Sequence, residues 1–311
     1  MKEFHHVSVL LQECIDGLNI KPDGIYVDGT LGGAGHSSQI AARLTTGRLI
    51  GIDRDPVALA AAAKRLEPYK DRVTLVHSNF CEMDRVLEEL GISGVDGILM
   101  DLGVSSPQLD DGERGFSYMV DAPLDMRMNN EDDLSAETVV NTWPHEELKR
   151  ILYTYGEERY APQIAAAICR RREERPIATT LELVDIIRSA MPPAALREKQ
   201  HPAKRSFQAI RIAVNDELGS VEKAMEVSIP LLNPGGRLAI ITFHSLEDRI
   251  VKTAMADAAK GCTCPPQFPV CVCGKKPKVK LISRKPIVST PEELEANPRA
   301  RSAKLRVCEM L

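Results

Sequence analysis

A glycine-rich loop followed by an acidic residue is the feature of this sequence best suited to chemistry. The segment 28–36 reads Asp-Gly-Thr-Leu-Gly-Gly-Ala-Gly-His and comes directly after a short apolar run. Glycines let the chain turn tightly and let a ligand approach the backbone. Asp53 follows about twenty residues later, where a carboxylate can accept hydrogen bonds from both hydroxyls of a ribose. This spacing favours a cofactor that contains a nucleoside, such as NAD or S-adenosylmethionine.

Three further features favour S-adenosylmethionine over NAD. Asp28 ends the first predicted strand, where its charge could help to hold the ammonium or sulfonium group of a methionine moiety. Asp101 ends the fourth predicted strand, close to where a transferable methyl group would lie at the carboxyl edge of a sheet. The last strand follows a long excursion of the chain, as in methyltransferases whose final strand is antiparallel. Phe80 is expected either to pack against an adenine ring or to belong to the core.

The elements that position these residues alternate between strands and helices. Buried strands are predicted at 24–28, 48–53, 73–76 and 95–100, with helices between them at 37–44, 56–66 and 83–90. After residue 215 the pattern resumes with a helix at 216–232 and strands at 237–243 and 302–311. Apolar strands separated by helices indicate a parallel sheet covered on both faces. We therefore expect an α/β fold with a Rossmann-like, S-adenosylmethionine-dependent methyltransferase sheet.

The middle of the chain follows a different pattern. Residues 107–215 contain turns and helices without a convincing central strand, and Thr179 and Glu182 have the spacing of a capping box. The simplest organisation is a discontinuous methyltransferase domain, formed by 1–106 and 216–311. An inserted helical domain at 107–215 interrupts it.

Composition sets limits on where the protein works. The 311 residues allow one large domain and a smaller one, and the net charge of −4 does not by itself indicate nucleic acid. Basic runs at 170–172, 197–205, 275–280 and 299–306 could still bind phosphates, or simply be solvated surface. No apolar run is long enough for a membrane span, and the first residues lack a signal-peptide core. We expect a cytoplasmic protein with no membrane partner, whose eight cysteines are thiols or metal ligands rather than disulfides.

Four of those cysteines form a cluster in a short, proline-rich stretch. They are Cys262, Cys264, Cys271 and Cys273, arranged as two Cys-x-Cys pairs. Four thiolates can hold zinc tetrahedrally, although Cys-x-x-Cys is the more usual spacing, and redox-active or simply free thiols are the alternatives. If zinc binds, we expect it to brace a loop beside the lysines of 275–280.

Several longer motifs resemble one family. They are Asp28-Gly29-Thr30, Gly35-His36-Ser37, Asp101 to Asp110, Arg114 to Ser117, Pro123 to Met128, Ser206 to Asn215, Phe243 to Arg249 and Asn297 to Ser302. Together they resemble the bacterial ribosomal RNA small subunit methyltransferase H family, also called MraW. The resemblance covers nearly the whole chain.

The resemblance implies a reaction, a substrate and a set of cofactor contacts. The reaction is S-adenosylmethionine-dependent methylation of the exocyclic N4 of a decoding-centre cytidine, at rRNA position 1402, in the 16S rRNA of the small ribosomal subunit. The inserted helical domain would then recognise RNA. The implied cofactor contacts are Ala34, Gly35, His36, Asp53, Phe80, Asp101 and Gln108.

The residue that assists the amine stays open at this stage. Many amino-methyltransferases use an Asp/Asn-Pro-Pro-aromatic motif, whereas this chain reads Asp101-Leu102-Gly103-Val104. The hypothesis is that Asp101 or a neighbouring backbone carbonyl accepts a hydrogen bond from N4. Ser105, Ser106 or His244 would then lie nearby.

Three alternatives stand beside this interpretation. One is a methyltransferase of the same fold that acts on DNA or protein. A second is a non-catalytic RNA-binding assembly factor, which the intact Gly33, Gly35, Asp53 and Asp101 argue against. The last is an NAD-dependent oxidoreductase, for which no group suited to hydride transfer is evident. The sequence gives no expectation for the oligomeric state.

Overall fold

The structure is a computed structural model that describes residues 8–262, 264–265, 270 and 272–311. The chain forms two compact units, one made of Met1–Gly103 with Leu218–Leu311 and the other of Val104–Glu217. These limits lie within a few residues of the domain boundaries expected at 106/107 and 215/216. No helix among the described residues is both long and apolar enough to cross a membrane.

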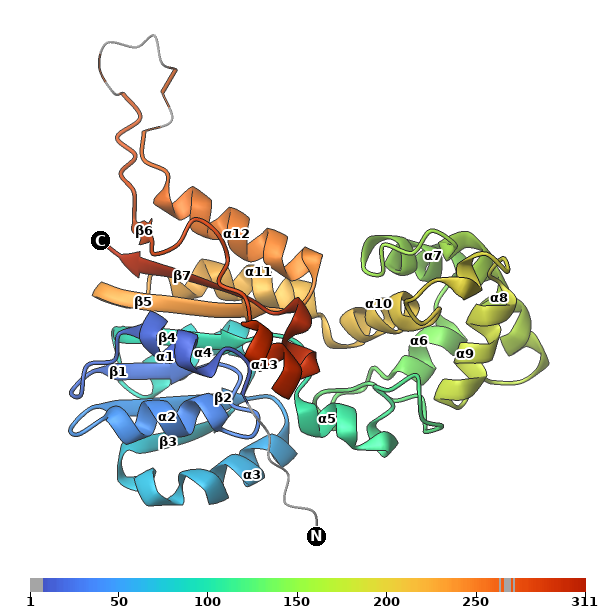
Figure 1. The fold of residues 1–311 in the computed structure, drawn as a ribbon, viewed down its shortest axis with the longest axis horizontal. Helices are drawn as coiled ribbons and strands as arrows, with labels where there is room; N and C mark the ends of the chain where they lie inside the picture. Colours follow the sequence, from blue (N-terminus) through green and yellow to red (C-terminus); the bar gives the residue numbers. More distant parts are fainter. Residues whose placement is uncertain (1–7, 263, 266–269, 271) are drawn as a thin grey trace. The chain divides into compact units, whose positions relative to one another are not determined.

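The first unit is built on a seven-stranded sheet with the order β3-β2-β1-β4-β5-β7-β6 (Figure 1). Its strands are β1 (Ile25–Asp28), β2 (Arg48–Asp53), β3 (Val73–His77), β4 (Val95–Asp101), β5 (Leu232–Thr242), β6 (Val279–Leu281) and β7 (Lys304–Met310). Strands β1 to β5 are parallel, whereas β7 is antiparallel to both β5 and β6. The α/β class and the antiparallel final strand expected from the sequence are therefore confirmed.

Helices cover both faces of this sheet because its central strands are apolar on both sides. One core joins α1 (Leu11–Leu18), α2 (Gly35–Arg43) and α3 (Pro56–Leu66) to strand residues such as Tyr26 and Leu49. The other joins α4 (Met83–Glu89), α11 (Glu217–Ser228) and α12 (Ser245–Ala259) to residues such as Val27 and Ile50. Adjacent strand residues enter opposite cores, as the alternation of side chains along a strand requires.

The differences from the predicted elements lie mainly at element ends and in short segments. Helix α1, the short helix α13 (Pro291–Ala296) and strand β6 were not predicted. Strand β5 begins at Leu232 rather than at the expected residue 237, because Leu232 pairs with Val95 at the irregular start of β4. Short 3₁₀ helices complete the connections at Glu67–Arg72, Phe80–Glu82, Gly112–Arg114, Ala195–Arg197 and Pro298–Ser302.

The second unit is helical and has a core of its own. Its helices are α5 (Ser106–Asp110), α6 (Ala136–Thr142), α7 (His145–Thr154), α8 (Ala161–Glu174), α9 (Thr180–Ser189) and α10 (Lys204–Asn215). Within its described residues the structure has no extended strand, only an isolated bridge between Pro123 and Thr179. The capping box predicted from Thr179 and Glu182 is present at the start of α9.

Asn215 ties the end of α10 to the segment that precedes α6. Its side-chain amide donates to the carbonyl oxygens of Met126 and Arg211 at 2.8 and 2.9 Å, and its Oδ1 accepts from the Met128 N–H at 2.8 Å. The Asn215 side chain is buried. If it were removed, the backbone groups that it bonds would lose their hydrogen-bond partner and would not gain water in its place.

We expect Asn215→Ala to lower the free energy of unfolding of the second unit by about 2–4 kcal/mol, because it leaves buried backbone groups unpaired. Trp143, the single tryptophan of the chain, packs against the core of this unit. Urea denaturation followed by its fluorescence therefore measures the change. The exposed Asn130→Ala is the matched control and should change stability by less than about 0.5 kcal/mol. Equal effects of the two substitutions would show that the Asn215 hydrogen bonds do not contribute to the free energy of unfolding.

Candidate cofactor site at the carboxyl edge of the sheet

Three acids end three adjacent strands of the first unit. Asp53 ends β2, Asp28 ends β1 and Asp101 ends β4, and these strands are neighbours in the sheet (Figure 1). Since the carboxyl ends of parallel strands meet at one edge, the three side chains gather where open α/β sheets bind their ligands.

Asp28 organises the glycine-rich loop. Its Oδ1 accepts from the Thr30 N–H at 3.1 Å, and its Oδ2 accepts from the Ser37 hydroxyl at 2.6 Å. Burial raises the pKa of Asp28 to about 6, and the hydrogen bonds from Ser37 and Thr30 limit the rise. Both oxygens are thus engaged inside the loop, so Asp28 shapes the site and adds negative charge to it.

Asp53 joins the loop to the end of β2. Its Oδ2 accepts from the Gly32 N–H at 2.7 Å, and its Oδ1 accepts from the Asp55 N–H at 2.9 Å. Burial raises the pKa of Asp53 to about 6, and these backbone N–H groups oppose the rise. The carboxylate is therefore mostly ionised at neutral pH. Each oxygen can accept a second hydrogen bond, as binding to a diol requires.

Asp101 is the least compensated of the three acids. Its backbone N–H donates to the Thr30 hydroxyl at 2.5 Å, but its buried Oδ1 has no hydrogen-bond partner among the described residues. The side chain as a whole keeps 25% of its surface exposed. Burial raises the pKa of Asp101 to about 8, and the charges of Asp28 and Glu247 add to the rise. A positively charged ligand would relieve this accumulation of negative charge.

His36 lies beside Asp101 at the start of α2. One ring nitrogen, Nε2, lies 3.0 Å from the carbonyl oxygen of Val9, which can only accept, so Nε2 carries a proton. The other, Nδ1, faces Asp101 Oδ2 at 3.9 Å, too far for a hydrogen bond. The ring therefore positions the first turn of α2 against the acid cluster.

The backbone around the loop leaves room for a ligand. A Cβ added at Gly33 would meet nothing within 4 Å, whereas one added at Gly29 would come within 3.0 Å of the Phe80 side chain. Ala34 has a φ of 56°, and α2 begins there without a side-chain cap. A helix N-terminus is a common binding place for polar or negatively charged groups of a ligand.

The structure brings six of the seven expected cofactor contacts into the first unit. Ala34, Gly35 and His36 start α2, and Asp53 and Asp101 end their strands. Phe80 is half-buried beside Gly29 and packs against one core, so it has the position for either of its two expected roles. Gln108 belongs to the second unit. There its Oε1 accepts from the Ser105 N–H at 3.0 Å.

The remaining catalytic candidates have local structural contacts. His244 is the N-cap of α12 and forms a capping box with Glu247. Ser105 pairs with Gln108, its hydroxyl accepting from the Gln108 N–H at 3.4 Å. Ser106 begins α5. None of these contacts assigns a role in catalysis.

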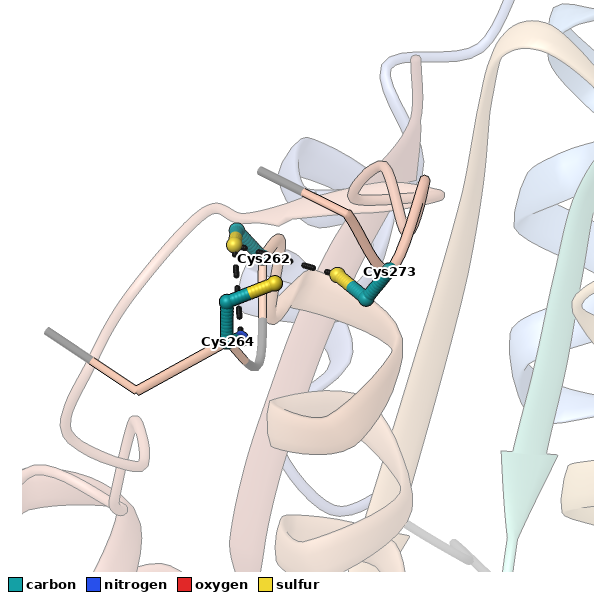
Figure 2. Close-up of side chains that lie close together, drawn as sticks. All are labelled: Cys262, Cys264 and Cys273. Atoms are coloured by element: carbon teal, nitrogen blue, oxygen red, sulfur yellow. Dashed lines mark hydrogen bonds between the residues drawn. The ribbon is translucent and has the colours of Figure 1, made fainter. Parts of the chain in front are cut away.

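Three of the four cysteines expected to bind zinc lie together in the first unit. Cys262, Cys264 and Cys273 have their sulfur atoms within 4.8 Å of one another (Figure 2). Cys271 lies outside the described residues.

Sequence reasoning missed residues that act through the acids. Thr30 links Asp28 to the backbone of Asp101, Ser37 holds Asp28, and Glu247 raises the pKa of Asp101. The positions of Thr30 and Ser37 within the glycine loop and its helix were the available signal. Glu247 lies within the Phe243 to Arg249 motif, but nothing in the sequence placed it near Asp101, because only folding brings α12 to this edge.

Comparisons with known proteins point to one family. The MraW methylase family model matches residues 3–311. Ribosomal RNA small subunit methyltransferase H of Brevibacillus brevis is 60% identical over 309 residues, 99% of this chain and 98% of that protein. The proteins of that name from Heliobacterium modesticaldum and Clostridium botulinum strain Kyoto are 57% and 60% identical, over 99% and 98% of this chain and 99% of each of those proteins. The chain therefore belongs to the MraW methylase family.

Proposed function

We propose that this protein transfers a methyl group from S-adenosylmethionine to the N4 atom of a decoding-centre cytidine in 16S rRNA. The choice of rRNA as the acceptor rests on family membership and on relatives near 60% identity that are named ribosomal RNA small subunit methyltransferase H. The choice of a cationic methyl donor rests on the buried carboxyl group of Asp101, whose Oδ1 has no hydrogen-bond partner among the described residues.

The residues at the sheet edge fit S-adenosylmethionine. When bound, this cofactor supplies an electrophilic methyl group on a positively charged sulfur. Asp53 would accept hydrogen bonds from the ribose hydroxyls, and Phe80 would pack against the adenine. The α2 start at Ala34, Gly35 and His36 would bind polar groups of the methionine moiety. Gln108 lies in the second unit, and its contact with the cofactor is implied by the family resemblance alone.

Asp101 has two candidate roles in this site. Its carboxylate would stabilise positive charge beside the sulfur, since Asp28 and Glu247 already make the local field negative. The same carboxylate, or a backbone carbonyl next to it, would accept a hydrogen bond from the N4 amine and orient its lone pair in line with the methyl group. The target base would have to leave its stack to reach the site.

The second unit is the proposed RNA-recognition domain. Of its basic residues, Arg172 donates to the carbonyl oxygens of Val140 and Trp143, so it serves the fold rather than the surface. Arg197, Lys199 and Lys204 are exposed and follow one another closely around His201, where they could contact phosphates.

The alternatives are weaker on specific grounds. The antiparallel β7 differs from the all-parallel sheet of dinucleotide-binding folds, which disfavours an NAD-dependent oxidoreductase. A DNA or protein acceptor has no support among the relatives. An assembly factor without catalysis would have no need for acids maintained at the ends of three strands.

The proposed structural zinc has no part in this reaction. Cys262, Cys264 and Cys273 belong to the segment that follows α12, and the proposed methyl transfer assigns them no role.

Small ribosomal subunits from cells that lack this protein should accept labelled methyl groups from S-adenosylmethionine when the purified protein is added. Nucleoside analysis should find the label as N4-methylcytidine at one site of 16S rRNA. Subunits from cells that retain the protein are the matched control and should gain little label, since their site is already methylated. Label in another nucleoside would change the proposed acceptor. No label despite cofactor binding would favour the assembly factor.

The affinity for S-adenosylmethionine should fall as the pH is lowered from about 9 to about 7, by up to about tenfold. The pKa of Asp101 is about 8 in the ligand-free protein, so below that pH a proton must be lost before the carboxylate can pair with the sulfonium. Asp101→Asn should remove this dependence and weaken binding roughly ten- to hundredfold at high pH. S-adenosylhomocysteine, which lacks the sulfonium charge, should respond less. Calorimetric titration of both ligands measures these effects.

Asp53→Asn is the matched control for this experiment. It should weaken both ligands to the same degree, because both contain the ribose that Asp53 is proposed to bind. If Asp101→Asn also weakens both ligands equally, Asp101 does not face the sulfonium. If the activity of Asp101→Asn falls only in proportion to its cofactor binding, Asp101 is a cofactor ligand and does not assist the amine.

A further inference from the structure

The thiols of Cys262, Cys264 and Cys273 converge in the segment between α12 and β6. Cys273 Sγ lies 3.8 Å from Cys262 Sγ, and all three sulfurs lie within 4.8 Å of one another. Figure 2 shows the three cysteine side chains lying close together. Ligands placed about 2.3 Å from a tetrahedral zinc lie about 3.8 Å from one another, so the spacing suits a metal centre.

Backbone N–H groups also point at the sulfurs. The Cys264 N–H donates to Cys262 Sγ at 3.4 Å, and the Val272 N–H donates to Cys264 Sγ at 3.3 Å. Such bonds stabilise the thiolate form that a metal requires. Gly274 follows Cys273 with a φ of +63°, and an added Cβ there would meet nothing within 4 Å. The left-handed turn, rather than lack of space, calls for glycine at this position.

The segment has no apolar core to hold this geometry. None of its described residues between Lys260 and Lys278 is buried, and Val270 and Val272 are 70% and 72% exposed. Its base is closed by the Lys278 N–H, which donates to the Ala258 carbonyl oxygen at 2.8 Å. Something other than hydrophobic burial must therefore fix the thiols, and metal binding does so in small loops.

We propose that Cys262, Cys264 and Cys273 bind one structural Zn²⁺ ion. Cys271, the remaining cysteine of the two Cys-x-Cys pairs, lies outside the described residues. The ion crosslinks the loop and thereby orders the exposed Lys275, Lys276 and Lys278, which follow it directly. This inference does not depend on the proposed methyl transfer.

The test is metal analysis of the full-length protein, expressed with zinc and purified without a histidine tag under reducing conditions. We expect about one zinc per chain, and at least a tenfold loss in the double variant Cys262→Ser/Cys273→Ser. Cys169→Ser, a half-buried cysteine of the second unit, is the matched control and should retain zinc. Because the changed thiols lie outside both cores, circular dichroism of the double variant should match that of the parent protein.

A second readout follows the loop directly. Removing zinc with a chelator should speed tryptic cleavage after Lys275, and the double variant should be cleaved quickly without chelator. Cobalt in place of zinc should give the charge-transfer absorption of a tetrahedral thiolate site, and the double variant should lack it. Absence of stoichiometric zinc from the untagged protein, or zinc retained by the double variant, would overturn the proposal.

Discussion

The burial of three carboxyl groups at the ends of adjacent parallel strands is the constraint on which this structure depends. Taking a carboxylate out of water is costly, and the cost appears as the raised pKa values of Asp28, Asp53 and Asp101. Backbone N–H groups and the Ser37 hydroxyl compensate the first two acids. Asp101 keeps a buried oxygen without a hydrogen-bond partner among the described residues, so a bound cation would favour its ionised form.

The loop geometry follows from this compensation. The N–H groups of Thr30 and Gly32 are turned toward Asp28 and Asp53, and the Thr30 hydroxyl receives the N–H of Asp101. The loop is thereby bonded to three strands, and it delivers the uncapped start of α2 to the same edge. The glycines allow these contacts because they let neighbouring segments of the chain come close together, as Gly29 and Phe80 do.

The helical insertion leaves the sheet at the same functional edge. The chain passes from Asp101 at the end of β4 into the second unit and returns at α11. Each unit has its own apolar core, and the second unit secures its segment before α6 through the buried side chain of Asn215. A separate core allows the insertion to fold without disturbing the strand order on which the acids depend.

From the sequence alone, we predicted the succession of strands and helices along the first unit, the inserted helical region, and the acids at the ends of strands. These features are local: strands such as β2 are apolar on both faces, and the Thr179–Glu182 capping box spans one turn. Helix α1, the three-residue β6 and the start of β5 were not predicted. Strand β6 pairs with β7, and the start of β5 pairs with β4, so both strands depend on residues that are distant in the sequence. Folding alone sets three other features: the hydrogen bond from Ser37 to Asp28, the effect of Glu247 on the pKa of Asp101, and the 3.8 Å distance between Cys262 Sγ and Cys273 Sγ. They could not be predicted because charge, burial and sulfur–sulfur distance depend on which segments pack together, and residue spacing along the chain does not encode that packing.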